Sequence, residues 1–542
     1  MALPVTALED EAPPTTTARD SATVAGWTLV SRVTGLLRVV AIGAVLGPTY
    51  FANAFQAGYV VPNLVFTLIA GPVLAMVLVP GVVRAVGAGG LSRAREVFGR
   101  VSGWLLAVSA GIVVLLMVLA PAVAWTLTFG IPDPAQRARG LWLTTLLILL
   151  VAPQVLLYTL LHLGMAAQQA RGRFALAAGA PAVENIILIL TVMLAGWYYG
   201  TGLDVDNVPA ELVIVLGLGS TAAVAVHAAV QLFGTARAGM LTRPSMGWRH
   251  DAESIDPEAH AVTRRLMRSV GVAAWPTAAM FVLLALAGTV PGGVFVVQLS
   301  YSVFYALSYV SARAVSLAAL PGLSHAAHRA DGVTFGSAWR QGLTYAIIAS
   351  LPLLVLLAML SGPTADILAN GELRDAALIG VLATCLGVVA VAQLVGGVHD
   401  IGRQALFARL DDRVPRRASE VAFGVILVIA AATLLMPADG ARLVWLVGAI
   451  LAGELAAAGM VLVALRRVIR PERFIEPRPL AGALVATVAM VPVAATAWWL
   501  QHVTSIGRLG DLALLILGGV LALGVYVLVI RVAVPRRIGG GS

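Results

Sequence analysis

Long apolar runs recur along the chain, separated by short stretches of Gly, Pro and charged residues. At 1.5 Å per residue, a helix of about twenty residues crosses the ~30 Å hydrocarbon core of a bilayer. No water is available at that depth to bond the backbone, so such runs are expected to be helical. The pattern predicts fourteen helices, at 25–46, 53–79, 101–128, 141–167, 176–199, 212–234, 269–290, 294–322, 339–361, 375–398, 419–436, 442–465, 479–499 and 511–531.

The composition supports this interpretation. Of 542 residues, 59% are apolar and only 12% are charged, whereas soluble proteins carry about 25% charged residues. This difference excludes a soluble enzyme of several domains. The predicted fold class is an all-α polytopic membrane protein with about fourteen transmembrane helices.

The chain ends and the single cysteine add little chemistry. Residues 1–24 are largely polar, acidic and rich in Pro and Thr, which predicts a disordered cytoplasmic tail and no signal peptide. Residues 532–542 are predicted to be a second cytoplasmic tail, and its Gly-Gly-Gly-Ser end resembles an expression linker. Cys385 stands alone in an apolar run, so it cannot form an intramolecular disulfide. We expect no metal site and no resident cofactor.

Arginine supplies all 36 basic side chains, because the chain has no lysine. With the N-terminus placed in the cytoplasm, 28 arginines fall on the cytoplasmic side and five on the outer side. This bias predicts cytoplasmic N- and C-termini in a multi-pass plasma-membrane protein. The net charge of +9 is spread over short loops, so we expect no nucleic-acid partner. Three arginines remain within spans: Arg32, Arg38 and Arg313.

An internal repeat relates the two halves of the chain at an offset of about 240 residues. Val79–Arg84, at the predicted end of helix 2, resembles Leu320–His325 at the predicted end of helix 8. Ala170-Arg171 likewise resembles Ala408-Arg409. Pro-Gly and Ala-Arg are common pairs, but these matches occur in order at a near-constant offset. Six spans separate the copies, which predicts two six-helix lobes related by a pseudo-two-fold axis along the membrane normal. The predicted units are an N-lobe at 25–234, a cytoplasmic linker at 235–268, a C-lobe at 269–465 and two further helices within 466–531.

Several motifs are more specific than this pattern. Ser31-Arg32-Val33-Thr34-Gly35-Leu36-Leu37-Arg38 is followed by Asn53-Ala54-Phe55 and Pro62-Asn63-Leu64, and Phe407-Ala408-Arg409 follows helix 10. Together with Arg173-Phe174 and Trp248-Arg249, they resemble the MurJ/MviN family of lipid II flippases. That family belongs to the multidrug/oligosaccharidyl-lipid/polysaccharide exporter superfamily. The resemblance covers roughly 25–470. It implies export of the undecaprenyl-pyrophosphate-linked peptidoglycan precursor lipid II through a cavity between two lobes, in a bacterial plasma membrane with lipids and cell-wall synthesis proteins as neighbours.

The chain departs from the family pattern at several charged positions. Val39 and Asn53 stand where the family has Asp, and Ser302 stands at its helix-8 arginine. Phe66-Thr67 replaces an Arg-Arg pair, and Gly71 replaces the acid that follows. Fewer charges are therefore present to meet a pyrophosphate. A related exporter of another lipid-linked glycan, amphiphilic natural product or drug stays open as the alternative.

The three midspan arginines are the first candidate substrate-binding residues. A guanidinium matches phosphate oxygens, and its burial costs about 2.5 kcal/mol or more unless it faces a cavity or a partner. Arg32 and Arg38 lie ~120° apart on helix 1, so they need not hold one phosphate together. Arg313 follows Ser302 by three turns plus ~20°, which predicts that it replaces the missing arginine ~16 Å nearer the cytoplasm. Snorkelling to the inner interface is the alternative for Arg32 and Arg313. Asn53, Gln56 and Asn63 are predicted to extend the polar lining of the cavity.

Three acids within helices remain: Glu184, Glu420 and Glu454. They are predicted either to bind H+ or Na+ or to balance the midspan arginines. His162, His227 and His399 look isolated in the sequence, and packing roles are expected for them.

Enzymatic motifs are not found in the sequence. There is no Gly-rich phosphate loop, no His-Glu-x-x-His zinc motif and no nucleophile elbow, so no enzymatic activity is predicted. Transport would then be driven by an ion gradient, by membrane potential or by later consumption of the lipid. A membrane scaffold and a membrane glycosyltransferase are weaker alternatives. An inert scaffold has little use for midspan arginines, and no outer loop clusters acids or histidines.

Overall fold

The computed structural model describes residues 18–69, 79–245, 274–329, 331–469, 474–503 and 507–533, and every long element in these ranges is a helix. Twelve helical segments, counting α5 and α6 as one, are long and apolar enough to cross a membrane. The helices Tyr50–Ile69 and Ala274–Ala287 occupy the two remaining predicted positions. The predicted fold class is therefore confirmed.

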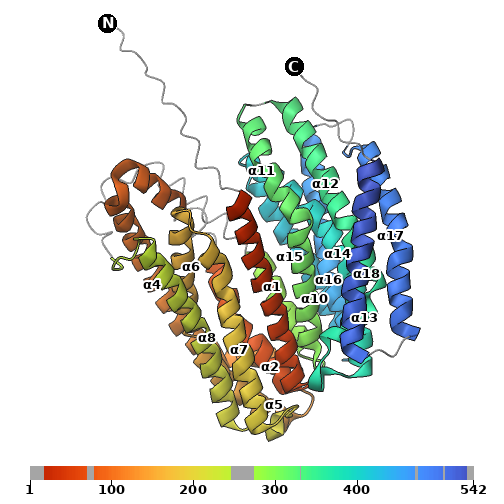
Figure 1. Cartoon of the computed structure of the whole chain (residues 1–542). Coiled ribbons are helices and arrows are strands. Elements are labelled where there is room, and N and C mark those ends of the chain that lie inside the picture. Colours follow the sequence, from red (N-terminus) through yellow and green to blue (C-terminus); the bar gives the residue numbers. More distant parts are fainter. Residues whose placement is uncertain are drawn as a thin grey trace.

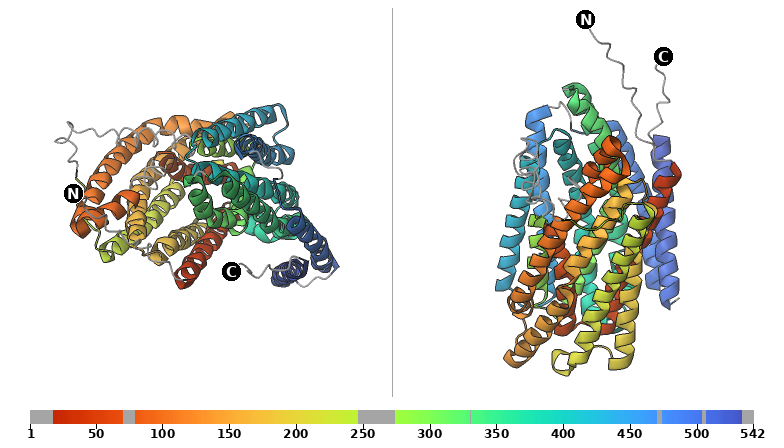
Figure 2. Two further views of the ribbon diagram at one scale, coloured as in Figure 1. Left: turned by 90° about the horizontal axis from the view of Figure 1, so that it is seen from above. Right: turned by 90° about the vertical axis from the view of Figure 1, so that its left-hand side faces the viewer.

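The helices form two bundles that lie side by side, with a further pair along one edge (Figures 1 and 2). The N-lobe contains α1 (Ala18–Leu46), α2 (Tyr50–Ile69), α4 (Val79–Thr128), α5 (Pro134–Val151), α6 (Gln154–Ala170), α7 (Ala175–Tyr199) and α8 (Ala210–Arg237). The C-lobe contains the helix Ala274–Ala287, α10 (Gly293–Val310), α11 (Ala312–His328), α12 (Gly332–Met359), α13 (Ser361–Leu368), α14 (Ala376–Ala408), α15 (Arg413–Ala432) and α16 (Gly440–Ile469). The pair α17 (Pro477–Val503) and α18 (Gly507–Ala533) packs against α12.

Among the described residues, the lobes share a hydrophobic core at one end only. The largest cluster of buried side chains joins the N-lobe residues Phe51 and Phe55 to the C-lobe residues Phe295 and Leu443. Toward the other end the N-lobe has its own cluster around Phe66, and the C-lobe has a separate one. Figure 1 shows the two bundles close together at the shared end and apart at the end where α1 begins. We call the shared end the predicted outer end and the opposite end the predicted inner end.

Hydrogen bonds reinforce the contact at the predicted outer end. Asn53 Nδ2 on α2 donates to the Val290 carbonyl (2.7 Å), and Asn53 Oδ1 accepts from the Val294 amide (3.1 Å). Thr201 Oγ1 donates to Glu372 Oε1 (2.7 Å), again between the lobes. Glu372 packs against the α1–α2 turn at Gly47, whose φ of +73° lies in the left-handed region that glycine adopts readily. The two lobes are therefore locked together at this end.

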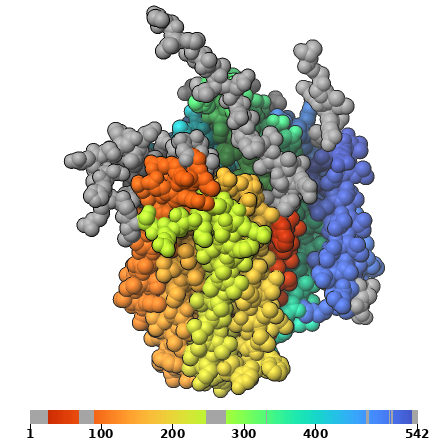
Figure 3. Space-filling view, turned by 60° about the vertical axis from the view of Figure 1, so that its left-hand side comes forward, coloured from red at the N-terminus to blue at the C-terminus, as the bar shows by residue number. Residues whose placement is uncertain are grey.

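Helix α1 links the lobes along their length. It packs against α7 of the N-lobe and reaches α10 and the short turn Gly371–Leu373 of the C-lobe. Figure 3 shows α1 at the surface, in the seam between the N-lobe and the pair α17–α18. Polar side chains on α1 can therefore meet either lobe.

Two helix starts differ from the prediction. Helix α4 begins at Val79 and not at 101, so Val79–Arg84 opens α4 and does not end helix 2. Glu96 accepts from both Arg93 and Arg100 at 2.6 Å, and such pairs one turn apart let a charged stretch continue a helix beyond the membrane. Helix α1 begins at Ala18, inside the tail predicted to be disordered.

Some predictions lie outside the described residues. They include residues 1–17 of the predicted tail, Gly71 and Trp248-Arg249, and most of the predicted 235–268 linker.

Two predicted continuous spans are broken helices. The span predicted at 141–167 is α5 followed by α6, interrupted at Ala152 and Pro153, where proline lacks the amide that a continuous helix needs. The span predicted at 294–322 is α10 followed by α11, interrupted at Ser311 (φ −102°, ψ −106°). The Ser311 hydroxyl donates to the Leu307 carbonyl at 2.8 Å.

Candidate functional site

Arg32 and Arg313 converge on one aromatic ring between the lobes. The Arg32 guanidinium carbon lies 4.5 Å from the centre of the Tyr309 ring, and that of Arg313 lies 4.4 Å from the same centre. Both also approach Tyr305, at 5.6 Å and 5.8 Å, and Arg313 donates weakly to the Tyr305 hydroxyl (3.4 Å). Among the described side chains, neither arginine forms an ion pair with a carboxylate. Two guanidinium groups, one from each lobe, therefore share one aromatic contact.

Arg313 follows Tyr309 by four residues, the spacing that brings side chains together on one face of a helix. The prediction for Arg313 assumed one straight helix over 294–322, whereas the structure has a break at Ser311. Helix α10 ends at Val310 and α11 begins at Ala312, and the Arg313 side chain contacts Tyr305 and Tyr309 across this break. Ser302 itself donates to the Gln298 carbonyl (2.7 Å) and offers no charge.

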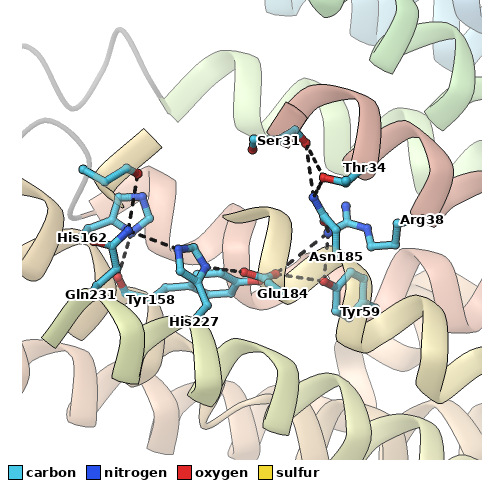
Figure 4. Close-up of polar contacts among 11 residues, drawn as sticks. Ser31, Thr34, Arg38, Tyr59, Tyr158, His162, Glu184, Asn185, His227 and Gln231 are labelled. Atoms are coloured by element: carbon cyan, nitrogen blue, oxygen red, sulfur yellow. Dashed lines mark hydrogen bonds and ion pairs between the residues drawn. The ribbon is translucent and has the colours of Figure 1, made fainter. Parts of the chain in front are cut away.

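Arg38 lies in a different environment, inside the N-lobe. Its Nη1 donates to Asn185 Oδ1 (2.9 Å) and to the Tyr59 hydroxyl (3.2 Å), and it lies 4.0 Å from Glu184 Oε1. Asn185 in turn donates to Thr34 Oγ1 (3.1 Å), which fixes α7 against α1 (Figure 4). The predicted separation of Arg32 and Arg38 agrees with these positions. The structure places Arg38 in a charge-balanced network and Arg32 beside Tyr309.

Glu184 is the centre of this N-lobe network. The Tyr59 hydroxyl donates to Glu184 Oε1 (3.2 Å), and His227 Nδ1 lies 2.8 Å from Oε2 (Figure 4). The other nitrogen of His227 faces the Gln231 amide at 3.5 Å. Glu184 is only 6% exposed, so its charge needs these donors and Arg38. Of the two roles predicted for Glu184, the contacts match charge pairing.

The predicted polar lining on α2 divides into three environments. Asn53 is fully engaged in the contact between the lobes at the predicted outer end. Gln56 is completely buried, and neither of its amide atoms has a hydrogen-bond partner among the described residues. Asn63 is exposed, two residues after Val61 of the shared core. Asn63 alone of these three side chains is open in this conformation.

The C-lobe holds a second carboxylate–imidazole pair. His399 Nδ1 on α14 lies 2.8 Å from Glu454 Oε2 on α16, and both line a cavity of about 200 Å³. Arg313 and Asp400 line the same cavity, and Asp400 accepts from Arg403. Glu420, by contrast, pairs with Arg416 one turn away (3.3 Å) on a partly exposed surface. The three predicted acids therefore have three different settings.

Sequence reasoning missed several of these partners. His227 and His399 were expected to be isolated, but each pairs with a carboxylate from another helix. The aromatic stripe Tyr301, Tyr305 and Tyr309 was also overlooked. Its spacing of four residues places all three rings along one face of a helix, and neighbouring rings lie 5.6 Å and 5.3 Å apart. The spacing of four residues is visible in the sequence and could have predicted the aromatic stripe that includes Tyr309.

The chain is similar to curated relatives over part of their length. It is 28% identical over 232 residues to the probable lipid II flippase MurJ of Vibrio cholerae serotype O1, which is 42% of each chain. It is 26% identical over 228 residues to the probable lipid II flippase MurJ of Haemophilus influenzae, covering 41% of this chain and 43% of the relative. Each match thus spans less than half of the relative.

Solved structures and a family model extend the similarity to most of the chain. A lipid II flippase MurJ in an inward closed conformation superposes with a TM-score of 0.69 at 15% identity, covering 94% of this chain and 98% of that one. An inward-facing multidrug resistance transporter of the MATE family, in the MOP superfamily, gives a TM-score of 0.62, covering 83% and 98%. These likenesses show a shared fold. The model of the lipid II flippase MurJ family matches residues 42–518, so this chain is a multi-pass membrane protein that belongs to the MurJ family.

Proposed function

We propose that this protein moves lipid II, an undecaprenyl-pyrophosphate-linked peptidoglycan precursor, from the inner to the outer leaflet by alternating access. The observation that carries the proposal is the convergence of Arg32 and Arg313 on Tyr309 from opposite lobes. A pyrophosphate is the anion that two forked, permanently charged guanidinium groups suit best. The role is transport without a chemical step.

The arrangement of the lobes supports the direction of entry. The shared core and the Asn53 and Thr201 hydrogen bonds close the predicted outer end, while the hydrophobic clusters are separate toward the predicted inner end. We infer that the lipid head enters between the lobes from the cytoplasmic side, and that the prenyl tail stays in the bilayer beside α1. Both ends of the chain are cytoplasmic in this proposal.

Binding of the head would change the contact between the lobes. In the structure, Tyr309 provides the nearer of the two ring faces that both arginines share, and Tyr305 provides the other. A pyrophosphate between the arginines is a far stronger acceptor and would draw the two lobes together at the inner end. Closure there would favour release of the Asn53 and Thr201 contacts at the outer end.

Depletion and rescue test this function. A bacterium whose own lipid II flippase can be depleted is expected to accumulate lipid II in the inner leaflet and lyse, and this chain should restore outer-leaflet lipid II and growth. Arg32→Ala and Arg313→Ala should each reduce rescue at least tenfold with normal membrane insertion. Arg374→Ala is the matched control, because Arg374 pairs with Asp366 on the surface (3.2 Å). Unchanged rescue by both arginine variants would contradict the proposed site.

Ser302 is the observation that keeps the alternative cargo open. A hydroxyl bonded to its own helix stands where the family has an arginine, so this position offers no positive charge where the family pattern has one. A related exporter of another lipid-linked glycan, natural product or drug fits that reduced charge. Failure of the inserted wild-type chain to restore lipid II export, with resistance to an amphiphilic drug gained instead, would favour this alternative.

A further inference from the structure

The C-lobe cavity contains a pair of groups that the anion site does not use. The cavity of about 200 Å³ lies among the helix Ala274–Ala287, α10, α11, α14, α15 and α16. Much of its wall is aromatic, with Trp275 and Phe423 in ring contact at 5.1 Å. His399 and Glu454 meet at this wall, in the membrane-spanning part of the molecule.

The geometry of the pair fixes which imidazole nitrogen is free. An ionised carboxylate can only accept, so His399 Nδ1 carries the proton that it shares with Glu454 Oε2 at 2.8 Å. A neutral imidazole then has its lone pair on Nε2. His399 Nε2 is buried and has no hydrogen-bond partner in the part of the chain that the structure describes. His399 Nε2 is therefore free to accept a proton, while Glu454 is bonded to the other nitrogen of the same ring.

The remaining polar groups around the cavity have other partners or no charge. Asp400 is engaged by Arg403, and Arg313 turns toward the rings of Tyr305 and Tyr309. The third phenol of the stripe, Tyr301, also lines the wall, whereas the helix Ala274–Ala287 and α15 contribute no charged side chain to it. Among the side chains that the structure describes, Glu454 thus has an imidazole as its partner but no guanidinium.

The N-lobe pair, Glu184 with His227, has both a guanidinium near its carboxylate and a polar group near the second imidazole nitrogen. Glu184 has Arg38 at 4.0 Å in addition to His227, and the second nitrogen of His227 faces Gln231. The charge of Glu184 is already balanced, so a proton added to His227 would leave a net positive charge in a closed core. The C-lobe pair becomes balanced when it gains a proton, and the N-lobe pair becomes unbalanced.

We propose that His399 and Glu454 form a proton-binding site that couples transport to proton movement. His399 Nε2 takes a proton from water that reaches the cavity, and Glu454 neutralises the resulting imidazolium. The new cation repels Arg313, which lines the same cavity, and biases the Arg313–Tyr309 contact toward separation. The coupling role rests on the proposed transport function, whereas proton binding itself does not.

Tryptophan fluorescence of the purified full chain, without cargo, tests proton binding. Trp275 lines the cavity, so we expect its emission to change between pH 5 and pH 8, and Trp275→Phe should remove that change. His399→Gln and Glu454→Gln should each abolish it. Glu420→Gln and His325→Gln should retain it, because these residues lie outside the cavity. A flat wild-type profile, or a transition that survives His399→Gln, would overturn the site.

Proton uptake provides a second measurement that does not depend on the fluorescent reporter. In a weakly buffered solution with a pH indicator, folded His399→Gln protein should take up about one proton fewer per chain than the wild type on acidification. The conservative variant Glu454→Asp should retain part of the uptake if His399→Gln does not fold. Equal uptake by the wild type and both folded variants of the pair, His399→Gln and Glu454→Gln, would contradict the inference.

Reconstituted vesicles separate the two proposals. If wild-type protein moves no lipid II while the fluorescence transition is present, the transport function fails and the proton site stands. If lipid II moves at the same rate with and without a pH gradient, and equally fast in His399→Gln, the coupling role fails and the transport function stands. If a pH gradient raises the rate of lipid II transport severalfold in the wild type but not in His399→Gln, the result supports both the transport function and the coupling role.

Discussion

Tyr309 links two guanidinium groups that would otherwise repel one another. Each lies within 4.5 Å of the ring centre, and a cation–π contact contributes about 0.5–2 kcal/mol. The attraction in such a contact comes from the face of the ring. The structure therefore assigns a positioning role to Tyr309 that depends on aromaticity.

Two substitutions at Tyr309 separate the ring from the hydroxyl. Tyr309→Phe keeps the ring face and should transport lipid II within about twofold of the wild type. Tyr309→Ala removes the nearer of the two rings shared by Arg32 and Arg313 and should lower the transport rate at least tenfold. Equal rates for the two variants in reconstituted vesicles would show that the ring has no such role.

The Arg38–Glu184 pair makes a prediction about stability. Removing one partner leaves the other charge buried and uncompensated, which costs about 3–5 kcal/mol. We therefore expect Glu184→Gln to lower the unfolding temperature in detergent clearly. The double variant Arg38→Met with Glu184→Gln should recover part of that loss. Glu420→Gln is the control, since its surface ion pair with Arg416 is expected to contribute little. A double variant less stable than the sum of both single changes would contradict the pairing.

The sequence identified the midspan charges better than their partners. Hydropathy singled out Arg32, Arg38 and Arg313, because a guanidinium in an apolar run is conspicuous, and Arg32 is the exposed one of the three. Their contacts come from helices distant in the sequence: Glu184 lies 146 residues from Arg38, and Tyr309 contacts Arg32 across the two lobes. Such pairs depend on tertiary packing, which spacing within one helix cannot supply.

Broken helices account for the main errors at the scale of elements. Pro153 is a visible sequence signal for the break between α5 and α6. The break between α10 and α11 lies at Ser311, with no proline to indicate it. The long start of α4 was missed because charged residues suggest a loop, whereas Glu96 and its two arginines support a helix outside the membrane. Segments that were apolar and uninterrupted, such as α7 and α14, were placed well at their starts.

The hydrogen bonds between the lobes make a prediction at the same scale. Thr201 and Glu372 lie in contact across the predicted outer end, so a short reversible thiol crosslinker between Thr201→Cys and Glu372→Cys should hold that end closed. The background is Cys385→Ala, which removes the native thiol. Transport should stop on crosslinking and return on reduction, while each single cysteine variant should stay active. Transport that continues in fully crosslinked protein would show that this end does not open.

At the scale of the whole molecule, the distribution of charge determines orientation. Arginine concentrates on one side of the predicted membrane. The structure places the first residues of α1 and the last residues of α18 at the same end of the molecule (Figure 1). A single cysteine at Ala135, in the predicted outer loop, should react with an impermeant maleimide in intact cells. One at Arg329, in a predicted inner loop, should react only after permeabilisation. The reverse pattern would invert the proposed topology.

The fold of the whole molecule was predictable because length and hydropathy identify membrane helices in a sequence. Fourteen segments and their order follow from those two properties. The closure at one end was not predictable, because it depends on contacts such as Asn53 with the Val290 carbonyl that form only when the lobes meet. Family membership, with a match over residues 42–518, agrees with the resemblance found in the motifs.

The central claim is that two arginines from opposite lobes hold the anionic head of the lipid. Binding of lipid II to the purified protein tests it most directly, by comparing the wild type, the double variant Arg32→Ala with Arg313→Ala, and the surface control Arg374→Ala. We predict that the double variant loses at least tenfold in affinity with an unchanged unfolding temperature, and that the control binds like the wild type. Equal affinity for all three proteins would contradict this account.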